Sequence, residues 1–153
     1  MRILGIDPGT GIVGFGVIDA VGQKKTMVDA GVIRTPAHQP LEERLATIYK
    51  EIVEIITLNK PEVMAIEQLF FGRNVTTAMS VSHARGVIVL AAQQAGLKIV
   101  EYTPPQIKQA LTGTGSADKK QVQAMVMLQL KLTEVPQPDD CADALAAALT
   151  FAP

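Results

Sequence analysis

The sequence is poor in the residue types that form disulfides and structural zinc sites. Its 153 residues include one cysteine, Cys141, and two histidines. A single cysteine excludes a disulfide within the chain, which is typical of proteins from a reducing, cytoplasmic compartment. The scarcity of cysteine and histidine also argues against a structural zinc site, because such sites are built mainly from these ligands. Composition therefore predicts a cytoplasmic location and a fold without cross-links.

Long uninterrupted apolar runs are missing as well. Charged residues and glycines break the apolar stretches before they reach the roughly 20 residues that span a bilayer, so we expect no transmembrane helix. The N-terminus enters a strand-like segment directly, without an apolar signal region and cleavage site. With 48% hydrophobic and 19% charged residues, the composition is that of a globular protein. We therefore expect residues 1–153 to form a single domain.

A strongly positive net charge, which often marks a nucleic-acid-binding protein, is absent too. The formal net charge is −1. Between residues 68 and 133, however, seven cations accompany two anions, so this stretch carries a net charge of +5. Such asymmetry fits a basic groove beside an acidic site. Solvated helix faces produce the same pattern, so charge alone decides nothing.

The apolar pattern predicts an α/β domain. Short apolar or alternating segments predict strands at residues 2–7, 12–19, 26–34, 62–67 and 97–102. Helical spacing and Pro or Gly boundaries predict helices that begin near Pro40 and Thr103, and others at about 76–94, 118–131 and 140–151. The first three strands are joined by short turns and should be antiparallel. The later strands need right-handed crossovers, so we expect a mixed five-stranded sheet with helices on both faces.

A glycine-rich turn at residues 9–14 matches the G-x-G-x-x-G pattern of dinucleotide-binding loops. That pattern requires a helix next, whose N-terminal amides bind the pyrophosphate. Here a β-branched, strand-like segment follows, which argues against a dinucleotide site. Sugar kinases and actin-like ATPases share this start, but they need a second related domain and a second phosphate loop, for which the chain is too short. An actin-like or sugar-kinase-like nucleotide-binding module is kept as an alternative function.

Two acids end apolar strands. Asp7 closes the first predicted strand and Glu67 closes the fourth. An ionised carboxylate in such a place is costly unless something neutralises it. Asp7 has a structural explanation as a cap of the turn at Pro8 and Gly9. If the two strands are neighbours, each carboxylate makes ionisation of the other more costly. A divalent cation between the two carboxylates removes this cost.

Two further acids begin the last predicted helix. Asp140 and Asp143 are three residues apart and so share one helix face. Both lie in the first turn, where the helix dipole favours negative charge, and Asp139 is a further cap or exposed acid. Four acids on two strand ends and one helix start can converge, and all-oxygen ligands suit Mg²⁺ or Mn²⁺. Two such ions about 4 Å apart activate water and stabilise the leaving oxygen in phosphodiester cleavage.

The ordered set of motifs resembles the RuvC family of Holliday-junction resolvases over essentially the whole chain. The matching segments are residues 5–10, 65–70, 84–86, 106–109, 113–119 and 140–146. The resemblance implies a ribonuclease H-like fold and a metal-dependent endodeoxyribonuclease, with two Mg²⁺ or Mn²⁺ ions in each active site. It further implies that the catalytic, metal-binding acids are Asp7, Glu67, Asp140 and Asp143. Members of the family usually carry a further tail after the position of Pro153.

The same resemblance implies partners and DNA-binding residues. The family acts as a homodimer that nicks two strands of a four-way junction symmetrically in DNA recombination and repair, together with the branch-migration helicase of that pathway. Phe70 matches an aromatic that stacks on opened bases, which is worth about 1–3 kcal/mol per base. Lys108 and Lys119 match lysines near the phosphate backbone, and Arg73 is a further DNA-binding candidate. Phe70 and Phe71 are otherwise explained as core residues.

The remaining candidates concern the histidines and the helix at 76–94. His38 lies in a proline-rich loop and should be solvated, and His83 should be an interface or surface residue. We assign neither to catalysis. The small residues of the helix fit a dimer contact, and burial against the sheet explains the same pattern. A related nuclease that acts on RNA precursors and a non-catalytic junction-binding protein are also compatible with the sequence.

Overall fold

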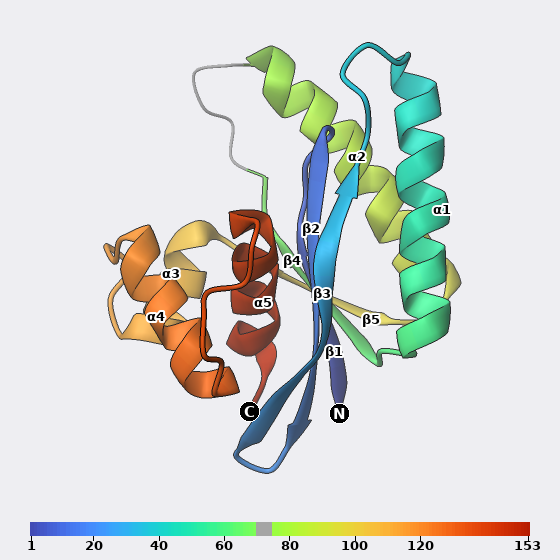
Figure 1. The fold of residues 1–153 in the computed structure, drawn as a ribbon. Coiled ribbons are helices and arrows are strands. Elements are labelled where there is room, and N and C mark those ends of the chain that lie inside the picture. Colours follow the sequence, from blue (N-terminus) through green and yellow to red (C-terminus); the bar gives the residue numbers. More distant parts are fainter. Residues whose placement is uncertain (70–74) are drawn as a thin grey trace.

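The computed structural model describes residues 1–69 and 75–153 and places a five-stranded sheet between two layers of helices (Figure 1). The strands are β1 (Arg2–Asp7), β2 (Ile12–Val21), β3 (Lys24–Arg34), β4 (Val63–Glu67) and β5 (Lys98–Tyr102). Their order in the sheet is β3-β2-β1-β4-β5. The first three strands pair antiparallel, whereas β4 pairs parallel with β1 and with β5. The predicted mixed sheet is confirmed, with strand boundaries within two residues of the expectation.

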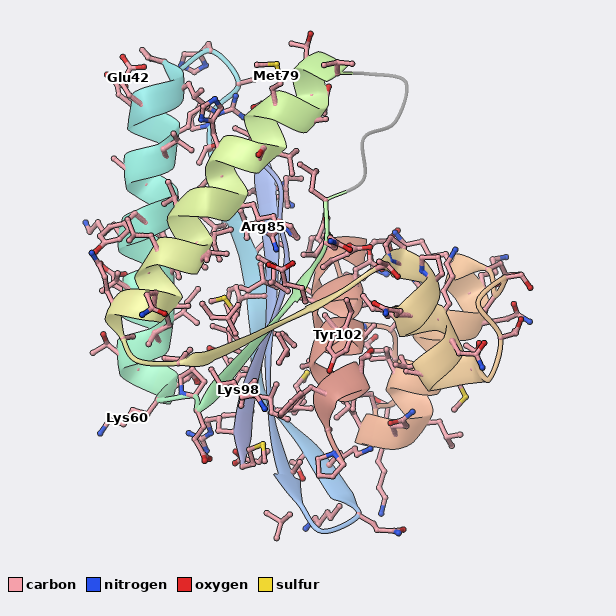
Figure 2. The ribbon with its side chains drawn as sticks, turned by 180° about the vertical axis from the view of Figure 1, so that it is seen from behind. Glu42, Lys60, Met79, Arg85, Lys98 and Tyr102 are labelled. Atoms are coloured by element: carbon pink, nitrogen blue, oxygen red, sulfur yellow. The ribbon has the colours of Figure 1, made fainter. Side chains whose placement is uncertain are left out.

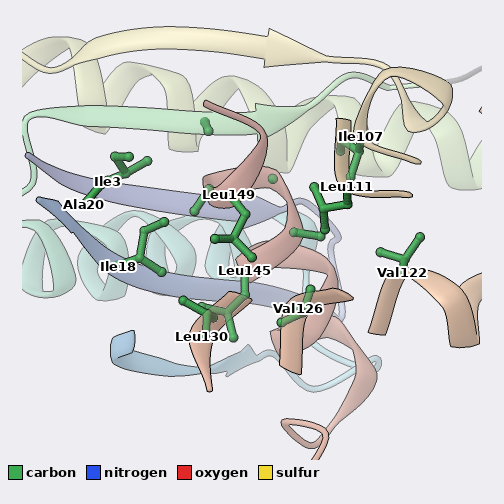
Figure 3. Packing of buried hydrophobic residues seen from close by; sticks show 14 of the residues in the cluster. Ile3, Ile18, Ala20, Ile107, Leu111, Val122, Val126, Leu130, Leu145 and Leu149 are labelled. Carbon is green, nitrogen blue, oxygen red and sulfur yellow. The ribbon is translucent and has the colours of Figure 1, made fainter. Parts of the chain in front are cut away.

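Helices cover both faces of this sheet, as the apolar pattern predicts. The helices are α1 (Leu41–Asn59), α2 (Val75–Gln94), α3 (Pro104–Thr112), α4 (Lys119–Leu130) and α5 (Asp139–Phe151). One face packs against α1 and α2 and the other against α3, α4 and α5 (Figure 1). On the second face, Leu145 and Leu149 of α5 lie over Ile3 and Ile18 of the sheet (Figure 3). Alternate residues of the central strands therefore fill two separate cores.

Helix α5 sits unusually close to the sheet because glycines lie beneath it. A Cβ atom on Gly5 would come within 1.9 Å of the carbonyl oxygen of Ala144. A Cβ atom on Gly14 would come within 2.1 Å of the carbonyl oxygen of Asp140. Only glycine permits such an approach of two backbones. These two glycines therefore determine how deeply the start of α5 is seated on β1 and β2.

Helix α2 combines a buried face with an exposed apolar one. In the described part of the chain, α2 is the single helix that is long and apolar enough, by length and composition, to cross a bilayer. The sequence pattern predicts no such helix. Core helices pass the same test, and α2 does bury Ala84 and Ile88 in the core next to α1. Arg85, which is labelled in Figure 2, also connects α2 to β5 through an ion pair of 2.5 Å with Glu101. Helix α2 therefore packs on the domain through one face and leaves an apolar face exposed.

Candidate active site

Asp7 and Glu67 lie side by side at the carboxyl ends of two neighbouring strands. In the parallel pairing of β1 with β4, Ile6 is opposite Ile66, so the next residue of each strand is an acid. The two carboxyl groups lie close enough that each shifts the pKa of the other through a side-chain hydrogen-bonding interaction. A hydrogen bond between them needs a proton on one of the two groups, because two carboxylates are both acceptors. The sheet register alone therefore creates the first half of the acidic cluster.

The start of α5 brings the other two acids to the same end of the sheet. Asp7 is paired with Gly14 across β1 and β2, and the backbone of Asp140 packs directly on Gly14. The charges of Asp140, Asp143 and Glu67 consequently all act on the Asp7 carboxyl. All four acids that the sequence singles out thus share one end of the sheet, although they come from three separate elements.

The accumulation of acids changes their protonation. Burial, followed by the charges of Glu67, Asp143 and Asp140, raises the pKa of Asp7 from 3.8 to about 8. Burial and the charge of Asp143 also raise the pKa of Glu67, although its hydrogen bond with Asp7 opposes the rise. Burial raises the pKa of Asp143 against the opposing effect of Lys119. The cluster therefore binds protons near neutral pH, which indicates a place where positive charge is favoured.

Two lysines lie next to the acids. A cleft of about 250 Å³ is lined by Glu67, Asp143, Lys108, Lys119 and apolar residues of α3, α4 and α5. The Lys119 ammonium donates a hydrogen bond of 3.2 Å to Asp143 and lies 3.4 Å from Asp139. Both lysines also lower the pKa of Glu67 through their charge. The cleft thus combines carboxylates with cations that can bind phosphate oxygens.

Local sequence explains how these lysines are held. Helix α3 begins with a capping box of Thr103 and Gln106, and α4 begins with one of Asp118 and Gln121. In each box the cap side chain accepts from a backbone amide, and the glutamine side chain accepts from the cap's own amide. These caps define where the two helices start. Lys119 is therefore the first residue of α4 and faces the cluster.

The donor chemistry of the cluster suits a hard divalent cation. Oxygen ligands are what Mg²⁺ and Mn²⁺ prefer, and the residues that can supply them are Asp7, Glu67, Asp140 and Asp143. Over residues 1–69 and 75–153, no three acidic, His or Cys side chains already surround one common ion position. Asp7 interacts with Glu67 and has a raised pKa, and Asp143 is bound to Lys119. Cation binding would require these contacts to open.

Some sequence predictions lie outside the described residues or away from the cluster. Phe70 and Arg73, the two further DNA-binding candidates, fall in the segment 70–74 and are not among the described residues. His38 and His83 are both exposed, as the sequence predicts for a solvated loop residue and for an interface or surface residue. Asp139 is expected from the sequence to be a helix cap or an exposed acid, and it is exposed but makes no cap, since α5 follows Pro138 without a side-chain cap.

Two contributors to this site do not emerge from the sequence. The sequence pattern places Gly14 only within a strand, and its role as the seat of α5 depends on a helix far along the chain. Nothing in the pattern connects Asp139 with Lys119, which precedes it by a whole helix. No local sequence signal predicts either contact. The presence of an acid directly before the D-x-x-D pair indicates only that Asp139 lies near the cluster.

Comparison with known proteins places this arrangement in a family. The family model described as crossover junction endodeoxyribonuclease RuvC matches residues 3–151. The chain belongs to the RuvC family. A relative from Desulfitobacterium hafniense, crossover junction endodeoxyribonuclease RuvC, is 55% identical over 152 residues, 99% of this chain and 92% of the relative. The RuvC of Brevibacillus brevis is 53% identical with the same coverage. This match gives no support to the nucleotide-binding alternative.

Solved structures of the family agree with the fold. Thermus thermophilus RuvC has a TM-score of 0.92 and 39% identity, over 98% of this chain and 92% of that one. The same protein in complex with a Holliday junction substrate has a TM-score of 0.90 and 37% identity, with the same coverage. A yeast mitochondrial Holliday junction resolvase, 13% identical with a TM-score of 0.68 over 97% of this chain and 78% of that one, shares the fold alone. The ribonuclease H-like fold is confirmed.

Proposed function

We propose that this RuvC family member is a structure-selective endonuclease that resolves four-way DNA junctions by metal-dependent hydrolysis of phosphodiester bonds. The observation that carries the proposal is the meeting of four carboxylates at one end of the sheet, beside a cleft with two lysines. The Thermus thermophilus relative, whose structure is known in complex with a Holliday junction substrate, suggests the same substrate here.

Each residue of the cluster has a definite part in this proposal. Asp7, Glu67, Asp140 and Asp143 would hold one or, as the family likeness implies, two Mg²⁺ or Mn²⁺ ions. Such ions would supply the Lewis acidity that activates water and stabilises a leaving oxygen. Asp7 would give up its proton on cation binding, so that both it and Glu67 can act as ligands. Lys108 and Lys119 bind phosphate oxygens and orient the scissile strand across the cleft.

The test compares a labelled four-way junction with a linear duplex, in Mg²⁺ or in chelator. We expect paired symmetric nicks on the junction only, and only with the cation. Asp7→Asn should abolish cleavage while junction binding in chelator is retained. Asp19→Asn is the matched control, because Asp19 lies on the surface in an ion pair with Arg2 and far along β2 from the cluster. Cleavage by the Asp7 variant at the wild-type rate would exclude the mechanism.

We further propose a homodimer that uses the exposed face of α2. Val75, Met79 and Leu90 are 60%, 57% and 50% exposed, and their spacing places them on one side of the helix with Ser82 and Gly86. Met79 lies near the start of α2 (Figure 2). Such a row of small and apolar residues allows two helices to approach closely. A second copy would supply the second active site that paired nicking needs.

The dimer can be tested separately from the chemistry. Met79→Glu should shift the protein to monomer in sedimentation equilibrium and convert paired nicks into single ones. Leu58→Glu is the matched control, since Leu58 is 79% exposed at the far end of α1. A dimer that survives the Met79 change would move the interface elsewhere. The branch-migration helicase and the cytoplasmic location expected from the sequence also remain proposals, and reconstituted junction processing would test the helicase.

A further inference from the structure

Lys119 lies between two carboxylates of α5. Its ammonium nitrogen is 3.2 Å from an oxygen of Asp143 and 3.4 Å from an oxygen of Asp139. The two acids are four residues apart and so lie on the same side of the helix, one turn above the other. The other oxygen of Asp139 accepts a hydrogen bond of 3.4 Å from the Gln123 side chain. Asp139 is therefore bound to two side chains of α4, and it is not one of the four acids of the cluster.

The position of Lys119 at a helix start favours an anionic partner. It is the first residue of α4, where the helix dipole disfavours a positive charge. Partial burial lowers the pKa of its amine, but the hydrogen bond to Asp143 and the charges of Asp143 and Asp139 outweigh this and raise it. Lys119 is thus a cation whose place beside the cluster depends on those two acids.

The proposed function creates a conflict over Asp143. The same carboxylate is bound to Lys119 and is needed as a ligand for a divalent cation. If Asp143 were the only partner of Lys119, cation binding would leave the lysine unpaired next to a double positive charge. The lysine would then move into solvent, away from the scissile phosphate. A second carboxylate within reach of the same ammonium resolves the conflict, and Asp139 is that carboxylate.

We propose that Asp139 is a positioning residue that holds Lys119 beside the active site when Asp143 turns to a divalent cation. This inference rests on the proposed function, since it assumes that Asp143 is a metal ligand. Asp139 itself touches neither cation nor DNA in this scheme. It lowers the cost of opening the contact between Asp143 and Lys119, because the lysine moves from one carboxylate to its neighbour.

Two simpler roles of Asp139 must be separated from this one. As an acid in the first turn of α5, it stabilises that helix through the dipole. As a negative charge near the cluster, it attracts any cation. Neither of these roles depends on Lys119. A double-mutant cycle between Asp139 and Lys119 therefore distinguishes them from the proposed role.

The experiment measures Mn²⁺ binding to the full chain without DNA, by electron paramagnetic resonance. The proteins are wild type, Asp139→Asn, Lys119→Ala, the double variant and Asp139→Glu. Glu134→Gln is the matched control, because Glu134 is an exposed acid on the connection from α4 to α5 that makes no ion pair with a described residue. Thermal unfolding of each variant in chelator measures any loss of helix stability separately.

We expect Asp139→Asn to weaken Mn²⁺ binding by about two- to fivefold, the range of exposed ion pairs. In the Lys119→Ala background the same change should have almost no effect, and Asp139→Glu should restore binding. Equal weakening in both backgrounds would reduce Asp139 to a simple charge and overturn the proposal, as would wild-type binding by Asp139→Asn. If the wild-type protein neither binds Mn²⁺ nor cuts junctions, the proposed function itself fails.

Discussion

Replacing Asp7 with asparagine should stabilise the cation-free protein, and the gain should grow as the pH rises. Asp7 is held in its protonated form by burial and by the charges of Glu67, Asp143 and Asp140, which raise its pKa from 3.8 to about 8. In the unfolded chain the same carboxyl is ionised at pH values above its ordinary pKa of 3.8. Folding therefore takes up a proton between these two pKa values, and the stability of the wild-type protein falls with rising pH across that window.

The magnitude follows from the width of the window. Each proton taken up on folding lowers the stability by about 1.4 kcal/mol per pH unit. The largest possible loss of stability between pH 5 and pH 8 is therefore about 4 kcal/mol. The slope flattens as the pH approaches the pKa of the folded state, which leaves about 3–4 kcal/mol. An asparagine amide removes this cost, because it is neutral at every pH and can donate a hydrogen bond to Glu67. For a domain of this size the corresponding shift in Tm is about 6–16 °C.

The assay is thermal unfolding in chelator at pH 5 and pH 8, for wild type, Asp7→Asn and Asp19→Asn. The Asp7 variant should gain much more at pH 8 than at pH 5. Asp19→Asn should change in the opposite direction, because the hydrogen bond from Arg2 lowers the pKa of Asp19 and the ion pair is lost. An Asp7 variant with the same gain at both pH values would refute the assignment of the cost to its charge. Added Mg²⁺ should stabilise the wild type and leave the Asp7 variant unchanged.

Two other predictions follow from the packing and the charges. Gly14→Ala should destabilise the protein by about 3 kcal/mol or more in chemical denaturation, because its Cβ would lie 2.1 Å from the carbonyl oxygen of Asp140. Gly86→Ala is the control, made in the Met79→Glu background so that the proposed dimer contact is removed. Its Cβ meets no atom of the same chain within 4 Å, so it should be neutral or stabilising by up to about 1 kcal/mol. Equal effects would mean that α5 is not seated on Gly14. Lys108→Ala should lower the slope of log affinity against log salt for junction DNA by about one, as a lost phosphate contact does, while Lys24→Ala at the tip of the β2–β3 hairpin should leave it unchanged.

Much of the fold could be predicted from the sequence because its signals are local. The strand that ends at Asp7 has the predicted boundaries, since an apolar run stops at Pro8 and Gly9. Helix α1 begins after Pro40 as its apolar spacing indicates, and α2 begins one residue before the predicted start. Asp7 and Glu67 can be found because an acid at the end of an apolar strand is costly wherever that strand lies. Asp140 and Asp143 can be found because their spacing of three places them on one face at the start of a helix. The protonation of Asp7 is out of reach of the sequence, because it depends on how closely the other acids approach it.

By itself, the sequence determined the order of strands and helices along the chain, the family and the four candidate acids. Each of these is indicated by short segments of neighbouring residues. The tertiary structure alone decided which carboxyl group keeps a proton, how deeply α5 lies on Gly14, and that Asp139 and Asp143 share Lys119. These properties depend on distances between segments from opposite ends of the chain. Coulomb energy and steric contact change over a single ångström, and no pattern of residue types along the chain specifies distances that finely.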